Sequence, residues 1–208
     1  YALDSHAVRK REEGRVHLDG FLSYPSAVYT VPYGVMVPKE VGNLLLPVPV
    51  SGSHIGFSTL RMEPCWMAMG QAAGIASALS IDGKVKVQNI DLSRLQDKLV
   101  DQKATLMYFK DVDYTSPHFR MVQYLGLRGY LPEWTARLQE PVDMATLTAW
   151  KKLSGKDLPG IEAGKTTRLV ALEMISNLDL ISFMSGIPHH ISSFKSTTLI
   201  RRRGSHCP

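Results

Sequence analysis

The chain has 208 residues, 44% of them hydrophobic and 21% charged, a balance typical of one or two globular domains and not of a disordered or fibrous protein. The net charge of +5 comes almost entirely from the end of the chain, because the first 180 residues hold 20 basic and 19 acidic side chains. A basic face that binds nucleic acid is therefore not expected. The two cysteines lie far apart and form no CxxC pair, so the pattern predicts neither a disulfide framework nor a cysteine-rich metal site.

The N-terminal part of the chain is predicted to contain short strands and loops. Residues 1–25 are polar and hold no basic segment followed by an apolar run, so we predict no signal peptide and expect a segment from the middle of a longer chain. Residues 27–37 are rich in β-branched and aromatic side chains, and Pro32 restricts them to an edge strand or two short strands. Residues 44–50 form an apolar run without alternation, which predicts a strand buried on both faces despite its two prolines.

A small-residue loop over residues 51–58 is followed by a predicted helix over residues 64–79, which opens with a proline suited to a first helical turn. Gly70 and Gly74 lie inside this helix, where each costs roughly 1 kcal/mol relative to alanine. Such a cost predicts a close backbone approach by a strand, another helix or a flat ligand. Polar and small side chains lower the hydrophobicity of this uncharged stretch, so we expect a buried helix and no membrane span.

The second half of the chain is predicted to be mostly helical. A leucine stripe over residues 91–99 indicates an amphipathic helix that packs on a core. Further helices are expected at about 119–129, 143–153 and 166–180, and we place a small helical module over residues 105–180. Residues 181–208 have no apolar periodicity and predict a disordered basic tail. Four potential ligands in this tail have no recurring metal-ligand spacing, so no metal site is predicted: His189, His190, His206 and Cys207.

Seven short motifs occur in one order over the first half of the chain, and as a set they are specific. They are Asp4-Ser5-His6, Val31-Pro32-Tyr33, Val37-Pro38-Lys39, Asn43-Leu44-Leu45, Ser51-Gly52-Ser53-His54-Ile55, Arg61-Met62-Glu63-Pro64 and Met69-Gly70-Gln71-Ala72-Ala73-Gly74. Together they resemble the C-terminal part of the bacterial FAD-dependent oxidoreductases, over roughly residues 1–107. Two positions depart from that pattern: Gly34 stands where many relatives have an arginine, and Pro49-Val50 where a cysteine or small residue is usual.

The resemblance implies an α/β fold, with residues 1–104 forming the closing strand and helix of an incomplete FAD-binding Rossmann-type domain. The small, mostly helical module at 105–180 and the tail at 181–208 follow it. No GxGxxG motif follows a strand in the 208 residues, so the segment that cradles the cofactor phosphates is missing. We therefore expect FAD as cofactor, a missing N-terminal FAD-binding segment as partner, and poor FAD binding by this chain alone.

The resemblance also implies site residues. Next to the flavin, His54 is the first candidate to take a substrate proton, although a loop histidine bonded to backbone is the alternative. Arg61 would anchor a substrate carboxylate or the flavin O2 edge, or else form a local salt bridge with a helix-capping Glu63. His6 is a second candidate base. The helix from Pro64 would aim its N-terminus at the cofactor, and the expected cofactor contacts are Ser51, Ser53, Glu63, Pro64, Gly70 and Gly74.

Two functions from different classes follow. The first is hydride transfer between FAD and a small organic substrate, for example one derived from a sugar. The alternative is a non-catalytic binding or scaffolding fragment that associates with a cell wall or glycan through residues 105–180. It rests on a loose, single-copy similarity to a surface-layer homology motif, carried by Phe109-Lys110-Asp111-Val112, Pro117-His118-Phe119, Leu125, Gly129-Tyr130, Pro141 and Thr167-Arg168. The sequence leaves the compartment open between the cytoplasm and the periplasm or cell envelope.

Overall fold

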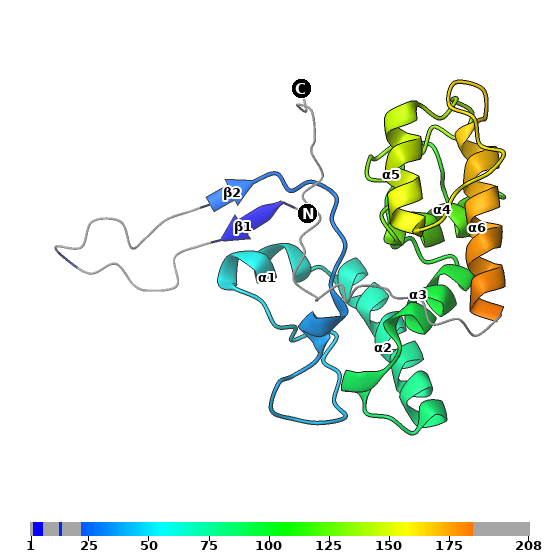
Figure 1. Cartoon of the computed structure of the whole chain (residues 1–208). Helices are drawn as coiled ribbons and strands as arrows, with labels where there is room; N and C mark the ends of the chain where they lie inside the picture. The colour runs from blue at the N-terminus through cyan, green and yellow to red at the C-terminus, as the bar shows by residue number, and fades with distance from the viewer. Residues whose placement is uncertain (1, 6–12, 14–21, 185–208) are drawn as a thin grey trace. The chain divides into compact units, whose positions relative to one another are not determined.

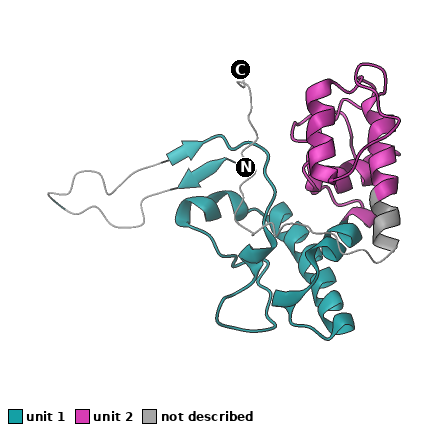
Figure 2. Ribbon diagram, in the orientation of Figure 1, with its two compact units in different colours: residues 1–99 teal, residues 100–208 magenta. Residues whose placement is uncertain are grey.

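A computed structural model describes residues 2–5, 13 and 22–184. The chain divides into two compact units, residues 1–99 and residues 100–208, and each is described by itself (Figure 2). Within the described ranges, no helix is both long enough and apolar enough to cross a membrane. His6 and the potential ligands of the C-terminal tail lie outside the described residues.

The first unit contains a two-stranded antiparallel sheet and two consecutive helices (Figure 1). Strand β1 (Leu3–Ser5) pairs with β2 (Leu22–Tyr24), with Leu3 opposite Tyr24. Helix α1 (His54–Leu60) packs against β1. This helix replaces most of the loop predicted at residues 51–58, because the Ser53 hydroxyl accepts the Gly56 N–H at 3.0 Å and so caps the first turn.

The strands predicted at residues 27–37 and 44–50 are wrong. The first region contains a short 3₁₀ helix, η1 (Tyr33–Met36), which begins after Pro32. The second forms no ladder, because its two prolines have no N–H to donate. It runs beside η1, held by the Leu46 N–H to the Met36 carbonyl at 2.8 Å and the Ser51 N–H to the Val35 carbonyl at 2.7 Å. The described residues therefore contain no closing strand of a Rossmann-type sheet.

Helix α2 (Glu63–Gly83) is the longest element of the first unit and ends at Lys84, which adopts a left-handed conformation. Its buried residues recur every three or four positions, as in any helix that packs on one side: Met69, Ala73, Ala76 and Leu79. Two of them join Met36, Val50 and Leu60 in the core of this unit. Gly70 and Gly74 do not make the close approach expected of them, since a Cβ at either position meets nothing within 4 Å among the described atoms.

The next two elements are η2 (Val87–Asn89) and α3 (Leu92–Asp101), and the second of these spans the division between the units. The Tyr33 hydroxyl donates to the Val87 carbonyl at 2.9 Å and so ties η2 to η1. Asp91 begins α3 by accepting the Ser93 N–H at 2.9 Å.

The second unit contains three helices around one apolar core: α4 (Phe119–Leu127), α5 (Met144–Ser154) and α6 (Arg168–Met184). Trp150 and Phe119 are its largest fully buried side chains. Gln123 is also fully buried, and its amide accepts the Leu106 and Met107 N–H groups and donates to the Met107 carbonyl. One polar side chain thus fixes the segment that enters this unit.

A loop over residues 136–142 runs beside the beginning of α6. The Leu169 N–H donates to the Leu138 carbonyl at 2.8 Å, and the Val142 N–H to the Thr166 carbonyl at 2.9 Å. Pro141 and Thr167 form an isolated antiparallel bridge between the two segments. These bonds fix the backbone of the two paired segments, which carry Arg137 and Arg168.

Candidate functional site

The corner between α1 and α2 gathers the polar groups of the first unit. Arg61 ends α1, and its Nη2 donates to Oδ2 of Asp4 on β1 at 3.2 Å. The two side chains are 40% and 23% exposed, so the pair is open to solvent on one side. The sequence analysis offered Glu63 as the partner of Arg61, and the structure gives it Asp4.

Further hydrogen bonds hold β1, and the segment that follows β2, against α1. The Asp4 N–H donates to Oγ of Ser58 at 3.0 Å, and the Ser58 hydroxyl donates to the Ile55 carbonyl at 2.6 Å. The Tyr29 hydroxyl lies 2.8 Å from Oγ1 of Thr59. Sequence reasoning missed these residues as part of a site, although Asp4 belongs to the first of the seven motifs.

His54 and Arg61 lie at opposite ends of α1. His54 is the first residue of the helix and is exposed. Seven residues of α-helix make about two turns and a rise of about 10 Å, so the two residues project from roughly the same side. The structure therefore places these two residues about two turns apart along α1.

The predicted cofactor contacts lie before α1 and in α2. The Ser51 N–H is used by the Val35 carbonyl, and the Ser53 hydroxyl by the cap of α1. Glu63 and Pro64 are the first two residues of α2, both exposed, after an N-cap residue whose side chain makes no capping bond. Glu63 is thus placed to interact with the positive end of the helix dipole.

The first turn of α2 can be tested for its fit to a flavin cofactor. Pro64 has no N–H, and the N–H groups of Cys65 and Trp66 both donate to the Met62 carbonyl, at 3.0 and 3.1 Å. A turn with these donors engaged and a carboxylate beside it is poorly suited to a pyrophosphate. The indole N–H of Trp66 is buried and has no hydrogen-bond acceptor among the described residues. An additional acceptor near this turn is what a carbonyl-bearing ring would supply.

Cys65, in the same turn, is unsuited to act as a nucleophile. Burial raises the pKa of its thiol above the ordinary value, and this effect outweighs the opposing charge interaction. The sulfur is therefore a neutral thiol near pH 7. Chemistry at this corner has to come from other groups.

One side of α2 is exposed among the described residues and is apolar except for Gln71. Met67 is 74% exposed and Ile81 is 76% exposed, and Gly74 lies between them on the same side at helical spacing. An exposed face of this kind is typical of a surface that packs on further protein. The small residues at its centre allow a close approach by whatever covers it.

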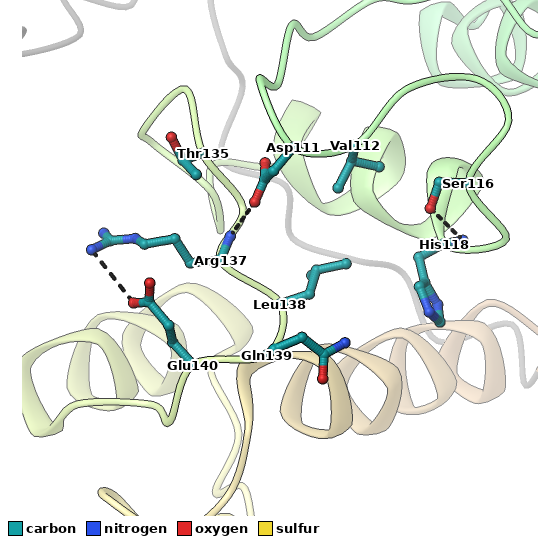
Figure 3. Close-up of a pocket in the computed structure, with 9 residues that line it drawn as sticks. All are labelled: Asp111, Val112, Ser116, His118, Thr135, Arg137, Leu138, Gln139 and Glu140. Atoms are coloured by element: carbon teal, nitrogen blue, oxygen red, sulfur yellow. Dashed lines mark hydrogen bonds and ion pairs between the residues drawn. The ribbon is translucent and has the colours of Figure 1, made fainter.

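The second unit has a shallow depression of about 420 Å³ (Figure 3). Among the residues that line it, the Asp111 carboxylate accepts the backbone N–H groups of Ala136 and Arg137, each at 2.8 Å. The Arg137 side chain pairs with Glu133 and with Glu140, and Figure 3 shows it extended towards Glu140. No residue of this depression was among the predicted site residues. Over the part of the chain that the structure describes, no three His, Cys, Asp or Glu side chains are grouped to hold a metal ion.

Comparison with known proteins gives a match to the first unit. No curated protein and no solved structure matches the chain significantly. A family model does match, and its span, residues 1–99, coincides with the first compact unit. By this match, residues 1–99 are similar to the FAD dependent oxidoreductase family, which supports a flavin-linked redox function in general.

Proposed function

We propose that this chain supplies the closing part of an FAD-dependent oxidoreductase that transfers hydride between FAD and a small organic substrate. The observation that carries the proposal is the family match, which begins and ends with the first compact unit. When bound, FAD supplies the hydride-accepting ring, and the protein supplies binding, orientation and electrostatics. The remaining question is which residues do so.

His54 is proposed to take the substrate proton, and Arg61 to bind a substrate carboxylate or a flavin carbonyl. Both residues project from one side of α1, about two turns apart, so a small molecule lying along the helix can meet both. Asp4 would act as a positioning residue, because it holds the Arg61 guanidinium at 3.2 Å. His6 follows Asp4 by two residues in the sequence and stays the second candidate base.

The cofactor contacts are proposed to centre on the flavin ring. Ser51 and Ser53 precede α1, and Glu63 and Pro64 begin α2, so the four residues flank the corner that holds Arg61. Gly70 and Gly74 lie one to three turns further along α2, with no described atom within 4 Å of an added Cβ. They would admit a close neighbour from a segment that carries a phosphate-cradling loop.

The test is flavin binding and reduction by the intact protein. The chain alone is titrated with FAD and followed by flavin fluorescence, and it is then expressed in frame with any upstream coding segment that holds a GxGxxG motif. We expect weak binding by the chain alone and stoichiometric FAD in the longer protein. A longer protein that folds but retains no FAD would contradict the proposal.

Site residues are tested in the flavin-loaded protein by stopped-flow reduction with substrate. His54→Asn should slow the reduction and change its pH profile, and Arg61→Ala should raise the substrate KM more than Arg61→Lys. Lys98 on α3 gives a matched control in Lys98→Ala, which should leave both parameters unchanged. Unchanged reduction in the His54 and Arg61 variants would overturn the site assignment while leaving the family match intact.

A second candidate function is glycan association through residues 105–180, carried by the depression in Figure 3. Its rim offers hydroxyl, amide and imidazole groups that can hydrogen-bond to sugar hydroxyls: Ser116, Thr135, Gln139 and His118. Binding of the full chain to cell-wall polysaccharide would be measured in a pull-down. The variant Gln139→Ala should weaken this binding. If the variant and the unaltered chain were retained equally, the depression would be excluded as the glycan-binding site.

A further inference from the structure

Buried polar residues gather where β1 packs on α1. Among the described residues, five polar or charged residues are buried, and three of them belong to these two elements: Ser5, Ser58 and Thr59. A buried hydroxyl costs free energy unless it is hydrogen-bonded, and an apolar side chain would fill the same space without directional bonds. Satisfied polar groups fix one arrangement of the elements that they join. The contact between β1 and α1 is therefore suited to fixing an orientation.

Ser58 uses its hydroxyl both as a donor and as an acceptor. Its Oγ donates to the Ile55 carbonyl within α1 at 2.6 Å, and it accepts the Asp4 N–H of β1 at 3.0 Å. The first bond is a common one for a serine inside a helix, and it engages the one hydrogen of the hydroxyl. The second bond joins residues that are 54 positions apart in the sequence. Because Ser58 is only 4% exposed, water has little access to either bond.

Asp4 is held at two points by residues that lie three positions apart. Its N–H donates to Oγ of Ser58 in α1, and its Oδ2 lies 3.2 Å from Nη2 of Arg61, which follows the last residue of α1. Side chains three positions apart lie on one face of a helix, so both can reach the same strand residue. A single bond would leave Asp4 free to turn about it, whereas two bonds fix its backbone and its carboxylate together. The carboxylate in turn fixes the direction of the Arg61 guanidinium.

We propose that Ser58 is a positioning residue, which aims the Arg61 guanidinium at a ligand carboxylate by holding the backbone of Asp4. The inference rests on the proposed function, because Arg61 is the group proposed there to bind a substrate carboxylate. The Arg61 side chain is 40% exposed and can meet a ligand, whereas Ser58 is buried and acts through Asp4. The three residues form one unit, so the loss of the Ser58 hydroxyl should loosen the Arg61 side chain.

The first test follows the Arg61 side chain by NMR in the full chain, without flavin. Its Nε–Hε signal is assigned by its loss in Arg61→Lys, and the ¹H–¹⁵N heteronuclear NOE of this signal reports motion on the picosecond to nanosecond timescale. Ser58→Ala should lower this NOE, and Asp4→Asn should lower it to a similar value. The same NOE in Ser58→Ala and in the unaltered chain would overturn the proposal.

The second test measures the binding of acetate, as a carboxylate probe, to the flavin-loaded protein at constant ionic strength, from the change in flavin absorbance. Ser58→Ala should weaken acetate binding by about two- to tenfold, the range expected for the loss of one hydrogen bond. The double variant of Ser58→Ala with Asp4→Asn should bind acetate no more weakly than Asp4→Asn alone, because both changes act within one unit. Normal acetate affinity in Ser58→Ala, with weaker binding in Arg61→Ala, would overturn this proposal alone. Normal acetate affinity in Arg61→Ala would instead contradict the role of Arg61 in the proposed function.

Ser154 in the second unit provides a matched control. Its hydroxyl also donates to a carbonyl three residues earlier, that of Lys151 at 3.1 Å, and accepts a backbone N–H, that of Lys156 at 3.3 Å. Ser154→Ala should therefore leave the Arg61 NOE and the acetate affinity unchanged. If Ser58→Ala fails to fold, Ser58→Cys keeps a side chain of similar shape whose thiol donates and accepts only weakly, so it should produce the same two changes. A Ser58→Cys variant that matches the unaltered protein in both measurements would overturn the proposal.

Discussion

The ion pair between Arg61 and Asp4 matters for orientation more than for stability. Its two side chains are 40% and 23% exposed, and pairs open to solvent contribute about 0.2–1 kcal/mol. That is small beside the 5–15 kcal/mol of an ordinary domain. The pair nevertheless holds a flexible side chain in one direction, next to the first turn of α2. We therefore propose that Asp4 positions the Arg61 side chain.

Gln123, in contrast, matters for stability, because it is fully buried and makes three hydrogen bonds to the segment at 106–107. Gln123→Ala should lower the free energy of unfolding by about 3 kcal/mol, since it leaves two backbone N–H groups without an acceptor. Urea denaturation followed by tryptophan fluorescence measures the change. The exposed Gln139 gives a control, and Gln139→Ala should stay within about 0.5 kcal/mol of the unaltered chain. Equal losses in the two variants would contradict this role.

At the scale of elements, the longer helices and the short strands of the N-terminal part were predictable from the sequence, whereas helix α1 and the irregular structure at residues 44–50 were not. The helix expected at 143–153 is Met144–Ser154, because Asp143 caps its start and Gly155 takes the left-handed conformation at its end. These features are local, so the sequence displays them. The apolar run at 44–50 needs neighbouring strands to become a strand, and no described segment provides one.

Contacts at the candidate site were also not predictable from local sequence features. Arg61 was predicted to be a candidate for charge-assisted binding and lies at the α1–α2 corner, and its partner Asp4 comes from a strand 57 residues earlier. The hydroxyl of Tyr29 meets Thr59 across 30 residues. Pairings at such separations depend on tertiary packing, which periodicity and caps do not reveal.

The cap of α5 should make the stability of the second unit depend on pH. Hydrogen bonds from the Thr146 N–H, and then from its hydroxyl, lower the pKa of Asp143 below its ordinary value. A lowered pKa in the folded state means that the carboxylate stabilises the fold above the unfolded pKa, and that this contribution is lost as the pH falls through the folded value. Asp143→Asn should retain the cap but lose this pH dependence, as seen by denaturation between pH 2 and about pH 6. If Asp143→Asn kept the pH dependence of the unaltered chain, ionisation of Asp143 would not be its cause.

Two helical glycines should respond in opposite ways to alanine. A Cβ at Gly126 lies 3.0 Å from Cζ of the buried Phe109, so Gly126→Ala should cost about 1–3 kcal/mol. At Gly74 nothing lies within 4 Å, so Gly74→Ala should gain about 1 kcal/mol in the chain alone. Thermal denaturation of both variants measures the difference. A loss at Gly74 in the chain alone would mean that another surface already covers this face of α2.

At the scale of the molecule, two separate cores of unequal size predict stepwise unfolding. Among the described residues, the core of the second unit has seventeen buried apolar residues and that of the first has five. The first unit should therefore unfold at lower urea concentration, and Gln123→Ala should move only the later transition. Single-tryptophan versions that keep Trp66 or Trp150 would report the two units separately. Coincident transitions for both probes would contradict independent cores.

Cys65 provides a built-in reporter of whether the first turn of α2 is covered. Burial raises the pKa of its thiol, so the thiolate that reacts with alkylating reagents is scarce near pH 7. Alkylation of the folded chain should be slower than that of the unfolded chain, and it should accelerate as the pH rises through the raised pKa. With Cys207→Ser in place, mass spectrometry would follow this single reaction. Slower labelling after an upstream segment is added would indicate that α2 has acquired a neighbour.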